Sequence, residues 1–455
     1  MRKDCMVKNN NRIGNIAGTI LGMGIALLAA QAVSAGNPIN LQECMNLAIK
    51  NNALLQVAEL NRNQFDTKTT QAKAQQLPTV GISGVYTHLG KVTSFSIPLG
   101  PGGAMKTIKF GTPENVNVNA KLQMPLFTWG RISGTVALAK AGRALSDIQG
   151  KQELFNVTDQ VLRAYYAVLL NREVIRVYET TLERAEKQVQ TAEKRFKTGN
   201  ASNLERLRAK MQWTNASGSL SEAKSNHAKS MLFLAKTIGV ADTHFTVTGA
   251  FAREPFQSEE NDLINRAMAG RSELGMLSVQ KVIQENSFRV ARSGDKPNLY
   301  VFSGYSVQNG FNPMEPNKFI ENWNAGVQLS IPLFDGFLTR HKTEEARIEL
   351  KKTALQEKEL HDLIRLQVRQ TLIGLRQAED KMTAQTENIE VSREALKTAE
   401  IQYENGVISS LDLIDFQQAL TQSELLYTQA LFNHIMTKLD LCKAVGDYHW
   451  FESSL

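Results

Sequence analysis

The chain has 455 residues, of which 42% are hydrophobic and 21% are charged, and its formal net charge is +7. This composition excludes an intrinsically disordered chain and a bundle of transmembrane helices. The charges alternate along the expected helices and do not cluster, so the sequence predicts no nucleic-acid partner.

Residues 1–35 have the pattern of a cleaved signal peptide. A basic start is followed by the uncharged apolar stretch Ile16–Ala30 and by Val33-Ser34-Ala35, which fits a small-x-small cleavage site. A retained membrane anchor is disfavoured, because this stretch has about 15 residues and a spanning helix needs about 20. We therefore expect an exported mature chain that begins at Gly36.

The first half of the mature chain, residues 36–249, begins with a helix and continues into two strands. We expect the helix over 40–76 and the strands over 79–89 and 116–125. From Val116 to Met124 apolar and polar residues alternate without a break, which is the period of a strand with one apolar face. At this length, a strand of a soluble sandwich and a strand of an outer-membrane barrel give the same pattern.

A long proline-free stretch follows, from Leu126 to Glu254, and it is rich in good helix formers. We expect helices over 128–198 and 203–238, with Gly199 ending the first and a following Asn or Ser capping the second. The first helix would have about 71 residues and a length of roughly 105 Å. Since no globular core is that wide, this helix belongs to a coiled coil or a tube.

Residues 250–455 repeat the first half. The expected elements are helices over 258–293, 336–405 and 410–445 and strands over 298–308 and 322–332. A constant offset of 207 residues pairs Pro125 with Pro332 and the turn glycine Gly199 with Gly406. Matches at a constant offset across strands, helices and turns indicate an internal duplication.

Four prolines are expected at strand ends, where a missing N–H group is tolerated. They are Pro78, Pro125, Pro297 and Pro332. Pro78 and Pro297 are 219 residues apart, and a loop between the two prolines of each half accounts for the different offset.

Four strands in one chain are too few to close a barrel, and open sheet edges are not tolerated in lipid. Each strand has about 10 residues, the length of a tilted membrane-spanning strand. Three chains would supply twelve strands. We therefore expect a mixed fold, in which a homotrimer closes a twelve-stranded membrane β-barrel that stands on a long α-helical barrel.

Several motifs resemble those of the TolC family of outer-membrane efflux and secretion channels. They are LQECMNLAIKNN (Leu41–Asn52), the strand ends MPLF and IPLF, the turn YENGVISSLDLIDFQQA (Tyr403–Ala419) and its first-half copy FKTGNASNLERLRAK (Phe196–Lys210). The resemblance covers essentially the whole mature sequence.

This resemblance implies a homotrimer in the outer membrane of a Gram-negative bacterium, with a helical tunnel in the periplasm. The channel would be a passive exit duct without a cofactor. Its partners would be outer-membrane lipid, a periplasmic adaptor protein and an inner-membrane transporter of the RND or ABC type.

Asp412 and Asp415 are three residues apart on an expected helix and so share a face near the turn. In the family, the matching acidic positions line the periplasmic constriction, which implies two rings of three carboxylates that favour cations. The alternative is that acidic residues in the first turn stabilise the helix N-terminus, and this alternative is stronger for Asp412 than for Asp415.

Glu205 and Tyr403 match family positions that join neighbouring helices in the closed state. A hydrogen bond between them is expected across the two turns, and the alternative is a solvated acid beside a packed tyrosine. Ile408 stands where some family members have an arginine, so the resemblance does not extend to a salt-bridge latch at that point.

The remaining metal- and redox-capable residues give no site. His227 and His434 are repeat equivalents, but neither has a ligand partner three or four residues away, so no metal site is predicted. Cys44 and Cys442 are the only cysteines after the leader, and a periplasmic disulfide and two free thiols fit the sequence about equally well.

Two other classes of protein are alternatives to an export channel. A periplasmic helical-hairpin adaptor without a pore would lack repeat-related strands of membrane-spanning length. A secreted enzyme would carry a phosphate-binding loop, a metal-spaced cluster or a nucleophile elbow, and the chain has none of these motifs, so it is not expected to be an enzyme. The sequence leaves drug efflux, metal efflux and type I protein secretion open.

Overall fold

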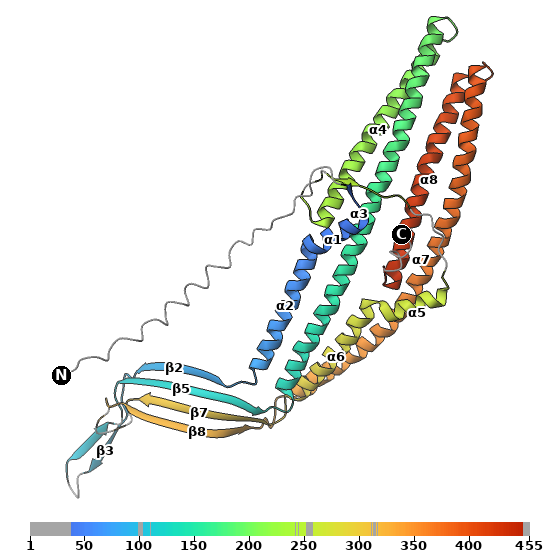
Figure 1. Cartoon of the computed structure of the whole chain (residues 1–455). Helices are drawn as coiled ribbons and strands as arrows, with labels where there is room; N and C mark the ends of the chain where they lie inside the picture. Colours follow the sequence, from blue (N-terminus) through green and yellow to red (C-terminus); the bar gives the residue numbers. More distant parts are fainter. Residues whose placement is uncertain are drawn as a thin grey trace, which may run out of the picture.

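The computed structural model describes residues 38–98, 103–109, 111–241, 243, 245–251, 258–310, 312, 315 and 317–448. The signal peptide expected over residues 1–35 lies outside these residues. Figure 1 shows an elongated molecule with a four-stranded sheet at one end and the tips of two helical hairpins at the other.

Two helical hairpins form the long part of the molecule. Their helices are α3 (Arg131–Lys197), α4 (Asn203–Ile238), α7 (Leu338–Glu404) and α8 (Ser410–Val445). α3 and α7 have 67 residues each, which corresponds to about 100 Å. α3 packs along α4, α7 packs along α8, and the hairpins meet where α3 contacts α8 (Figure 1).

The long helices begin slightly later than the expected starts at 128 and 336. The residues before them lie in the left-handed region, with φ of 49° at Trp129 and 88° at Gly130, and 66° at both Gly336 and Phe337. A right-handed helix needs negative φ, so it starts only after these residues. Because the two pairs are 207 residues apart, the passage from strand to helix is part of the duplication.

The structure corrects the expectation of single helices over 40–76 and 258–293. The observed helices are α1 (Leu41–Asn51), α2 (Ala53–Ala74), α5 (Glu260–Gly270) and α6 (Ser272–Arg292). The breaks fall at Asn52 (φ −68°, ψ 124°) and at Arg271 (φ −69°, ψ 123°). The Asn52 side chain accepts a hydrogen bond from the N–H of Leu54 and caps α2, which offsets the interrupted helical hydrogen bonds.

The sheet is fully antiparallel and joins the two halves of the duplication. Its strands are β2 (Thr79–His88), β5 (Glu114–Phe127), β7 (Asn298–Gln308) and β8 (Ile320–Ser330), in the order β2-β5-β7-β8. The halves meet at the pairing of β5 with β7. β2 and β8 are the edges, and within the described residues neither has a partner on its outer side.

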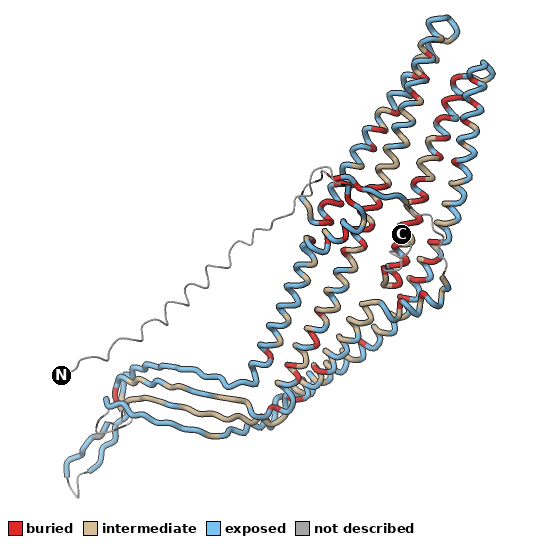
Figure 2. The backbone as a smooth tube through the Cα atoms, in the orientation of Figure 1, coloured by how far each residue is buried: buried red, intermediate tan, exposed pale blue. Residues whose placement is uncertain are grey.

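The register gives the sheet one apolar and one polar face, because directly opposed residues share a face. One row across the sheet is Ile82, Ala120, Tyr305 and Trp323, and the next row is Ser83, Asn119, Ser306 and Asn322. The apolar face is uncovered: Ile82 is 77% exposed and Trp323 is 73% exposed. In the described residues no second layer packs on the sheet (Figure 2), as one would in a soluble sandwich.

Two smaller pairs of strands complete the β-structure. The connection between β2 and β5 contains a hairpin of β3 (Ser94–Pro98) and β4 (Met105–Lys109), which projects beyond the sheet (Figure 1). β1 (Pro38–Ile39) pairs in parallel with β6 (Thr246–Val247). This short pair ties the described start of the chain to the connection between the two halves.

Three of the four strand-end prolines lie outside their strands, and the fourth does not. Pro78 and Pro297 directly precede β2 and β7, and Pro332 follows β8. Pro125 lies inside β5, where the register shifts between Pro125 and Phe127. This corrects the expectation that Pro125 ends its strand, and the irregular register accommodates a residue without an N–H group.

The buried core lies where the helices meet and not in the sheet (Figure 2). The largest cluster of buried apolar residues joins α1, α3, α4, β6 and the end of α8, and it contains Tyr166, Leu169, Leu234 and Leu439. A second cluster joins α5, α7 and α8, and a third lies near the tip between α7 and α8. None of the described helices is both long enough and apolar enough to cross a bilayer.

Candidate functional site

Two tight turns join the long helices at the end of the molecule farthest from the sheet (Figure 1). Each contains a glycine in the left-handed region, Gly199 with φ 76° and Gly406 with φ 74°. In both turns the residue that follows the glycine donates its backbone N–H to the carbonyl oxygen of the residue five positions before it. The distance from nitrogen to oxygen is 2.8 Å in each turn. The side chains of Ser202 and Ser409 then cap α4 and α8, so the two turns share one geometry.

Tyr403 and Glu205 join the two turns. The hydroxyl of Tyr403 on α7 donates to Oε1 of Glu205 on α4 over 2.8 Å. Tyr403 is only 5% exposed, and the guanidinium of Arg195 lies 4.9 Å from the centre of its ring. Burial, followed by the hydrogen bond to Glu205, raises the pKa of Tyr403 above its usual value. The hydroxyl therefore stays protonated and remains a donor.

Asp412 caps its own helix. Its Oδ2 accepts hydrogen bonds from the N–H of Ser409 over 2.9 Å and from the hydroxyl of Ser409 over 2.7 Å. These hydrogen bonds lower the pKa of Asp412 below its usual value. Asp412 therefore makes the helix-capping contacts that the alternative interpretation expects. Its side chain is nevertheless exposed, so its negative charge faces solvent.

Asp415 lies one turn further along α8, next to a polar groove. The groove has a volume of about 600 Å³ and lies between α3, α4 and α8. Gln418 donates across it to Oε1 of Gln212 over 3.1 Å. None of the side chains that line this groove is basic. Asp415 therefore adds a negative charge to a groove lined mainly by amides and hydroxyls.

Ile408 makes an apolar contact at the second turn. It is half-buried and packs against the cluster that contains Tyr403, Leu413 and Leu420. The position at which some family members carry an arginine is therefore filled by packing and not by a salt bridge.

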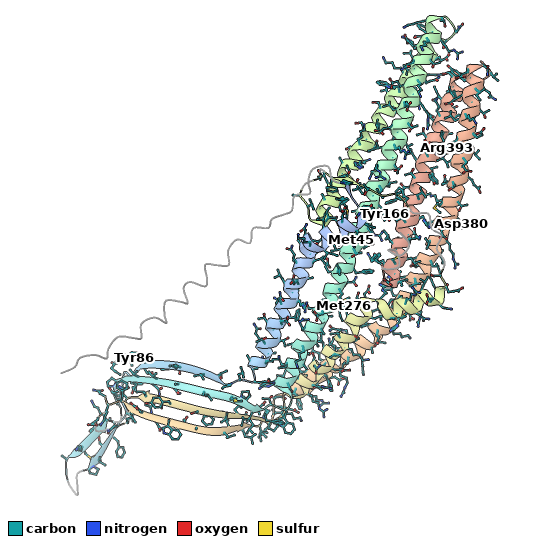
Figure 3. All side chains as sticks on the ribbon, viewed as in Figure 1. Met45, Tyr86, Tyr166, Met276, Asp380 and Arg393 are labelled. Atoms are coloured by element: carbon teal, nitrogen blue, oxygen red, sulfur yellow. The ribbon has the colours of Figure 1, made fainter. Side chains whose placement is uncertain are left out.

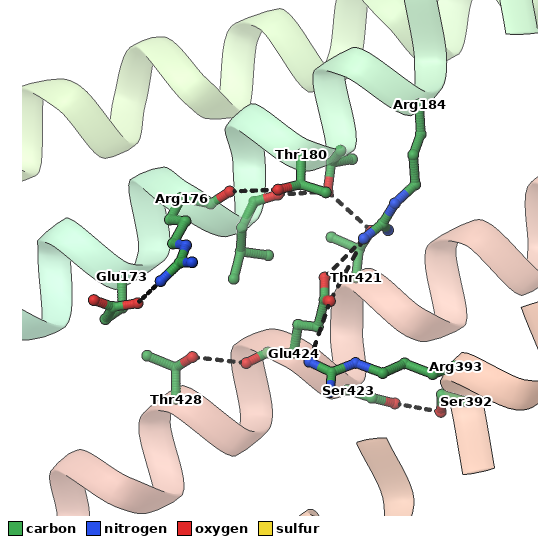
Figure 4. Close-up of polar contacts among 12 residues, drawn as sticks. Glu173, Arg176, Thr180, Arg184, Ser392, Arg393, Thr421, Ser423, Glu424 and Thr428 are labelled. Atoms are coloured by element: carbon green, nitrogen blue, oxygen red, sulfur yellow. Dashed lines mark hydrogen bonds and ion pairs between the residues drawn. The ribbon is translucent and has the colours of Figure 1, made fainter. Parts of the chain in front are cut away.

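A charged cluster between α3 and α8 was missed by the sequence analysis (Figure 4). Nη2 of Arg184 donates to Oε2 of Glu424 over 3.3 Å, and Arg393 lies 3.9 Å from the other carboxylate oxygen. The side chains of Arg184 and Glu424 are only 19% and 14% exposed. The sequence does contain a signal for this cluster, because Glu424 is the only carboxylate of α8 between Asp415 and Asp440.

The cysteines and histidines form no chemical centre in the described part of the chain. Cys44 and Cys442 are free thiols in the largest core cluster, and burial raises the pKa of each to about 12. His434 is buried with Nε2 3.7 Å from the carboxylate of Glu379, and His227 is half-buried. Among the described residues, no three His, Cys, Asp or Glu side chains are arranged to hold a metal ion.

Comparison with known proteins places this architecture in a family. The sequence model of the outer membrane efflux protein family matches residues 44–240 and 263–447, which lie in both halves of the duplication. The chain is 22% identical to outer membrane protein TolC of Vibrio cholerae over 323 residues, 69% of this chain and 73% of TolC. It is 23% identical to the alkaline protease secretion protein AprF of Pseudomonas aeruginosa over 306 residues, 66% of this chain and 63% of AprF.

The fold matches solved structures of outer-membrane channels. The CmeC outer membrane channel of Campylobacter jejuni superposes with a TM-score of 0.73 at 15% identity, covering 89% of this chain and 85% of CmeC. The resemblance read from the sequence is confirmed, and the alternative of a periplasmic adaptor is excluded, because the family consists of channel and transport proteins. The chain belongs to the outer membrane efflux protein family, and it is an efflux channel of the bacterial outer membrane.

Proposed function

We propose that three copies of the chain close a twelve-stranded barrel in the outer membrane. The observation that carries this proposal is the four-stranded sheet, whose apolar face is uncovered and whose edges β2 and β8 have no outer partner in the described residues. Neither edge strand contains lysine or proline, which natural edges use to prevent further pairing. Pairing β2 of one protomer with β8 of the next leaves no free edge in the lipid.

In the same trimer, the helical hairpins form a periplasmic tunnel that continues the barrel. The channel is a passive duct, with an inner-membrane transporter of the RND or ABC type as the source of energy. A periplasmic adaptor couples this transporter to the tips. The relative AprF is named for alkaline protease secretion, which supports protein secretion as one cargo class for this chain alongside small-molecule efflux.

The tip turns are the gate of this tunnel. Threefold symmetry repeats Asp412 and Asp415 into two rings of three carboxylates, which attract cations into a narrow pore. The hydrogen bond from Tyr403 to Glu205 holds the two hairpins of a protomer together at the same level. Gly199 and Gly406 shape the turns that carry these side chains.

Single-channel recording of the mature protein in a planar bilayer tests this function. The wild-type protein is expected to conduct and to prefer cations. In the double variant Asp412→Asn and Asp415→Asn, the cation preference is expected to fall several-fold, because the negative rings are gone. Asparagine at 412 keeps an acceptor for the capping hydrogen bonds of Ser409, so the substitution removes charge and preserves the turn.

Asp380→Asn is the matched control, since Asp380 is an exposed carboxylate on α7 away from the tip (Figure 3). Its ion preference is expected to equal that of the wild type. A double variant that keeps the full cation preference would contradict the acidic constriction and leave the channel itself standing. A folded protein that remains monomeric in detergent and in lipid would contradict the trimeric barrel.

A further inference from the structure

Lys121 occupies an isolated place in the middle of β5. It follows Ala120 and precedes Leu122, both on the apolar face, so Lys121 belongs to the polar face. Its direct partners across the two ladders are Gly81 on β2 and Gly304 on β7. The lysine side chain therefore rises from a row in which both neighbours lack side chains.

This arrangement leaves room beside Lys121 on the β2 side, whereas the side-chain amide of Asn324 lies over Gly304 on the β7 side. A Cβ at Gly81 would meet no atom within 4 Å, and the Lys121 side chain is exposed. The side chains before and after it on the same face are those of Asn119 and Gln123, which are neutral. No carboxylate of the sheet lies near enough in the register to neutralise Lys121.

Lys121 is also the only charged residue on the polar face of these four strands. Apart from the tyrosines, the other ionisable residues of β2, β5, β7 and β8 are His88, Glu114 and Glu321. The register places all three on the opposite face, at the strand ends farthest from the helices. There Nδ1 of His88 lies 2.7 Å from the carboxylate of Glu114.

A second cation reaches the same face closer to the helices. Arg131, the first residue of α3, donates from Nη2 to the hydroxyl of Tyr300 over 2.9 Å. Tyr300 lies directly opposite Gln328 on the neighbouring strand β8, so Tyr300 is also on the polar face. The polar face of the sheet thus carries two basic groups, and the tip of the hairpins carries exposed carboxylates.

We infer that Lys121 is a specificity-determining residue of the channel, which forms a ring of three ammonium groups inside the barrel and favours anionic solutes there. The inference rests on the proposed trimeric barrel, because only closure turns the polar face into a lumen. It assigns the duct two charged zones of opposite sign, acidic at the periplasmic tip and basic in the barrel. Solutes that carry carboxylate or phosphate groups gain from the second zone.

The effect of the ammonium ring on anion permeability depends on the salt concentration, and this dependence distinguishes the ring from other causes of selectivity. For a ring of three ammonium groups about 10 Å from the axis, Coulomb attraction with ionic screening predicts an anion permeability raised roughly fourfold at 0.01 M salt. The corresponding effect is about twofold at 0.1 M and negligible at 1 M, where the screening length is about 3 Å.

Whether Lys121 faces the lumen of the barrel or the lipid can be tested without a conductance measurement. Lys121→Cys and Leu122→Cys are each made in the mature protein, which lacks the leader residue Cys5, purified in lipid nanodiscs and treated with a membrane-impermeant, negatively charged thiol reagent. The native cysteines provide a silent background, because burial raises the pKa of Cys44 and Cys442 to about 12. We expect modification at 121 and none at 122. Equal modification, or modification at 122 alone, would overturn the inference.

The charge itself is tested by reversal potentials under a KCl gradient. Lys121→Gln and Lys121→Arg are compared in the Asp412→Asn/Asp415→Asn background, so that the tip does not dominate selectivity. We expect Lys121→Gln to lower anion permeability about fourfold at 0.01 M salt and to have no effect at 1 M, and Lys121→Arg to retain the preference. No change at 0.01 M would overturn the inference. A trimer that fails to form refutes the proposed function instead, and the labelling experiment separates these two results.

Discussion

Removing the hydroxyl of Tyr403 distinguishes the packing of the tyrosine ring from the hydrogen bond that joins the two tips. The ring is buried between helices of its own half, whereas the acceptor of the hydroxyl, Glu205, belongs to the other half. A hydrogen bond to a charged acceptor contributes about 1.5 kcal/mol net of the competing bonds to water. Because this bond links α7 to α4, it stabilises only the state in which the two tips are together.

We therefore expect Tyr403→Phe to raise the ratio of open to closed channel about tenfold, the equivalent of about 1.4 kcal/mol, as measured by open probability in single-channel recordings. Tyr178→Phe is the control, because Tyr178 lines the groove beside Asp415 and lies away from both turns. An open probability that is the same in both variants and in the wild type would show that this hydrogen bond does not hold the gate.

At the same scale, the sequence was informative about which residues meet and less so about what each contact does. Tyr403 and Glu205 were expected to bond, and the structure contains that bond. For Asp412 the sequence left helix capping and pore lining as alternatives, and the side chain makes the capping contacts while it stays exposed. The lining of a pore depends on neighbouring protomers, so one chain's residue pattern cannot determine it.

At the scale of elements, local signals located the helix ends that depend on local chemistry. The helices expected over 203–238 and 410–445 are α4 and α8 with the same bounds. Each ends at a glycine in the left-handed region, Gly239 with φ 72° and Gly446 with φ 83°. Serine at the start and glycine at the end are signals that lie within the helix's own sequence.

The breaks at Asn52 and Arg271 depend on contacts between distant segments and were missed for that reason. A Cβ at Gly239 would lie 2.7 Å from Cβ of Asn51, and one at Gly446 would lie 3.3 Å from Cα of Arg271. The end of α4 thus abuts the break in the first half, and the end of α8 abuts the break in the second. Arg271 makes no side-chain cap, unlike Asn52 at the first break.

The turn glycines give a prediction that isolates backbone conformation. At Gly199 a Cβ would meet no atom within 4 Å, so the only obstacle to alanine is the φ of 76°. Placing alanine in the left-handed region costs about 1 kcal/mol. We expect Gly199→Ala to increase the rate of tryptic cleavage at the α3–α4 turn about fivefold, since cleavage follows local opening.

Gly150→Ala is the opposite case and serves as the control. Gly150 lies inside α3, and a Cβ there also meets no atom within 4 Å. Because alanine is the better helix former by about 1 kcal/mol, this variant is expected to be cleaved no faster than the wild type. Faster cleavage in both variants would show that the turn responds to any loss of glycine and not to its left-handed conformation.

At the scale of the whole molecule, the duplication determines which strand edges of a single chain stay open. Each half supplies two strands and one helical hairpin, and the halves join in the middle of the sheet through β5 and β7. This pairing uses the inner edge of each half and leaves the outer edges, β2 and β8, open in the described residues. The apolar strand face could be read from the sequence. The order of the strands could not, because it is decided by contacts across more than 170 residues.

The open edges lead to a prediction about backbone hydrogen exchange. In an antiparallel sheet, alternate residues of an edge strand turn their N–H groups away from the only partner. If each protomer kept its edges open, about half of the amides in β2 and β8 would exchange rapidly. If β2 of one protomer pairs with β8 of the next, those amides are bonded, and they are expected to be as slow as the amides of β5 and β7.

Residue-level deuterium exchange on the protein in lipid nanodiscs measures this difference within one sample. β5 and β7 are internal references, because both have a strand on each side. Uniform protection across all four strands requires that the outer edges be paired, and it is the result expected for a closed barrel. Fast exchange at every second residue of β2 and β8, beside protected amides in β5 and β7, would mean that the outer edges are not hydrogen-bonded to a neighbouring strand. A twelve-stranded barrel would then be the wrong assembly for this chain.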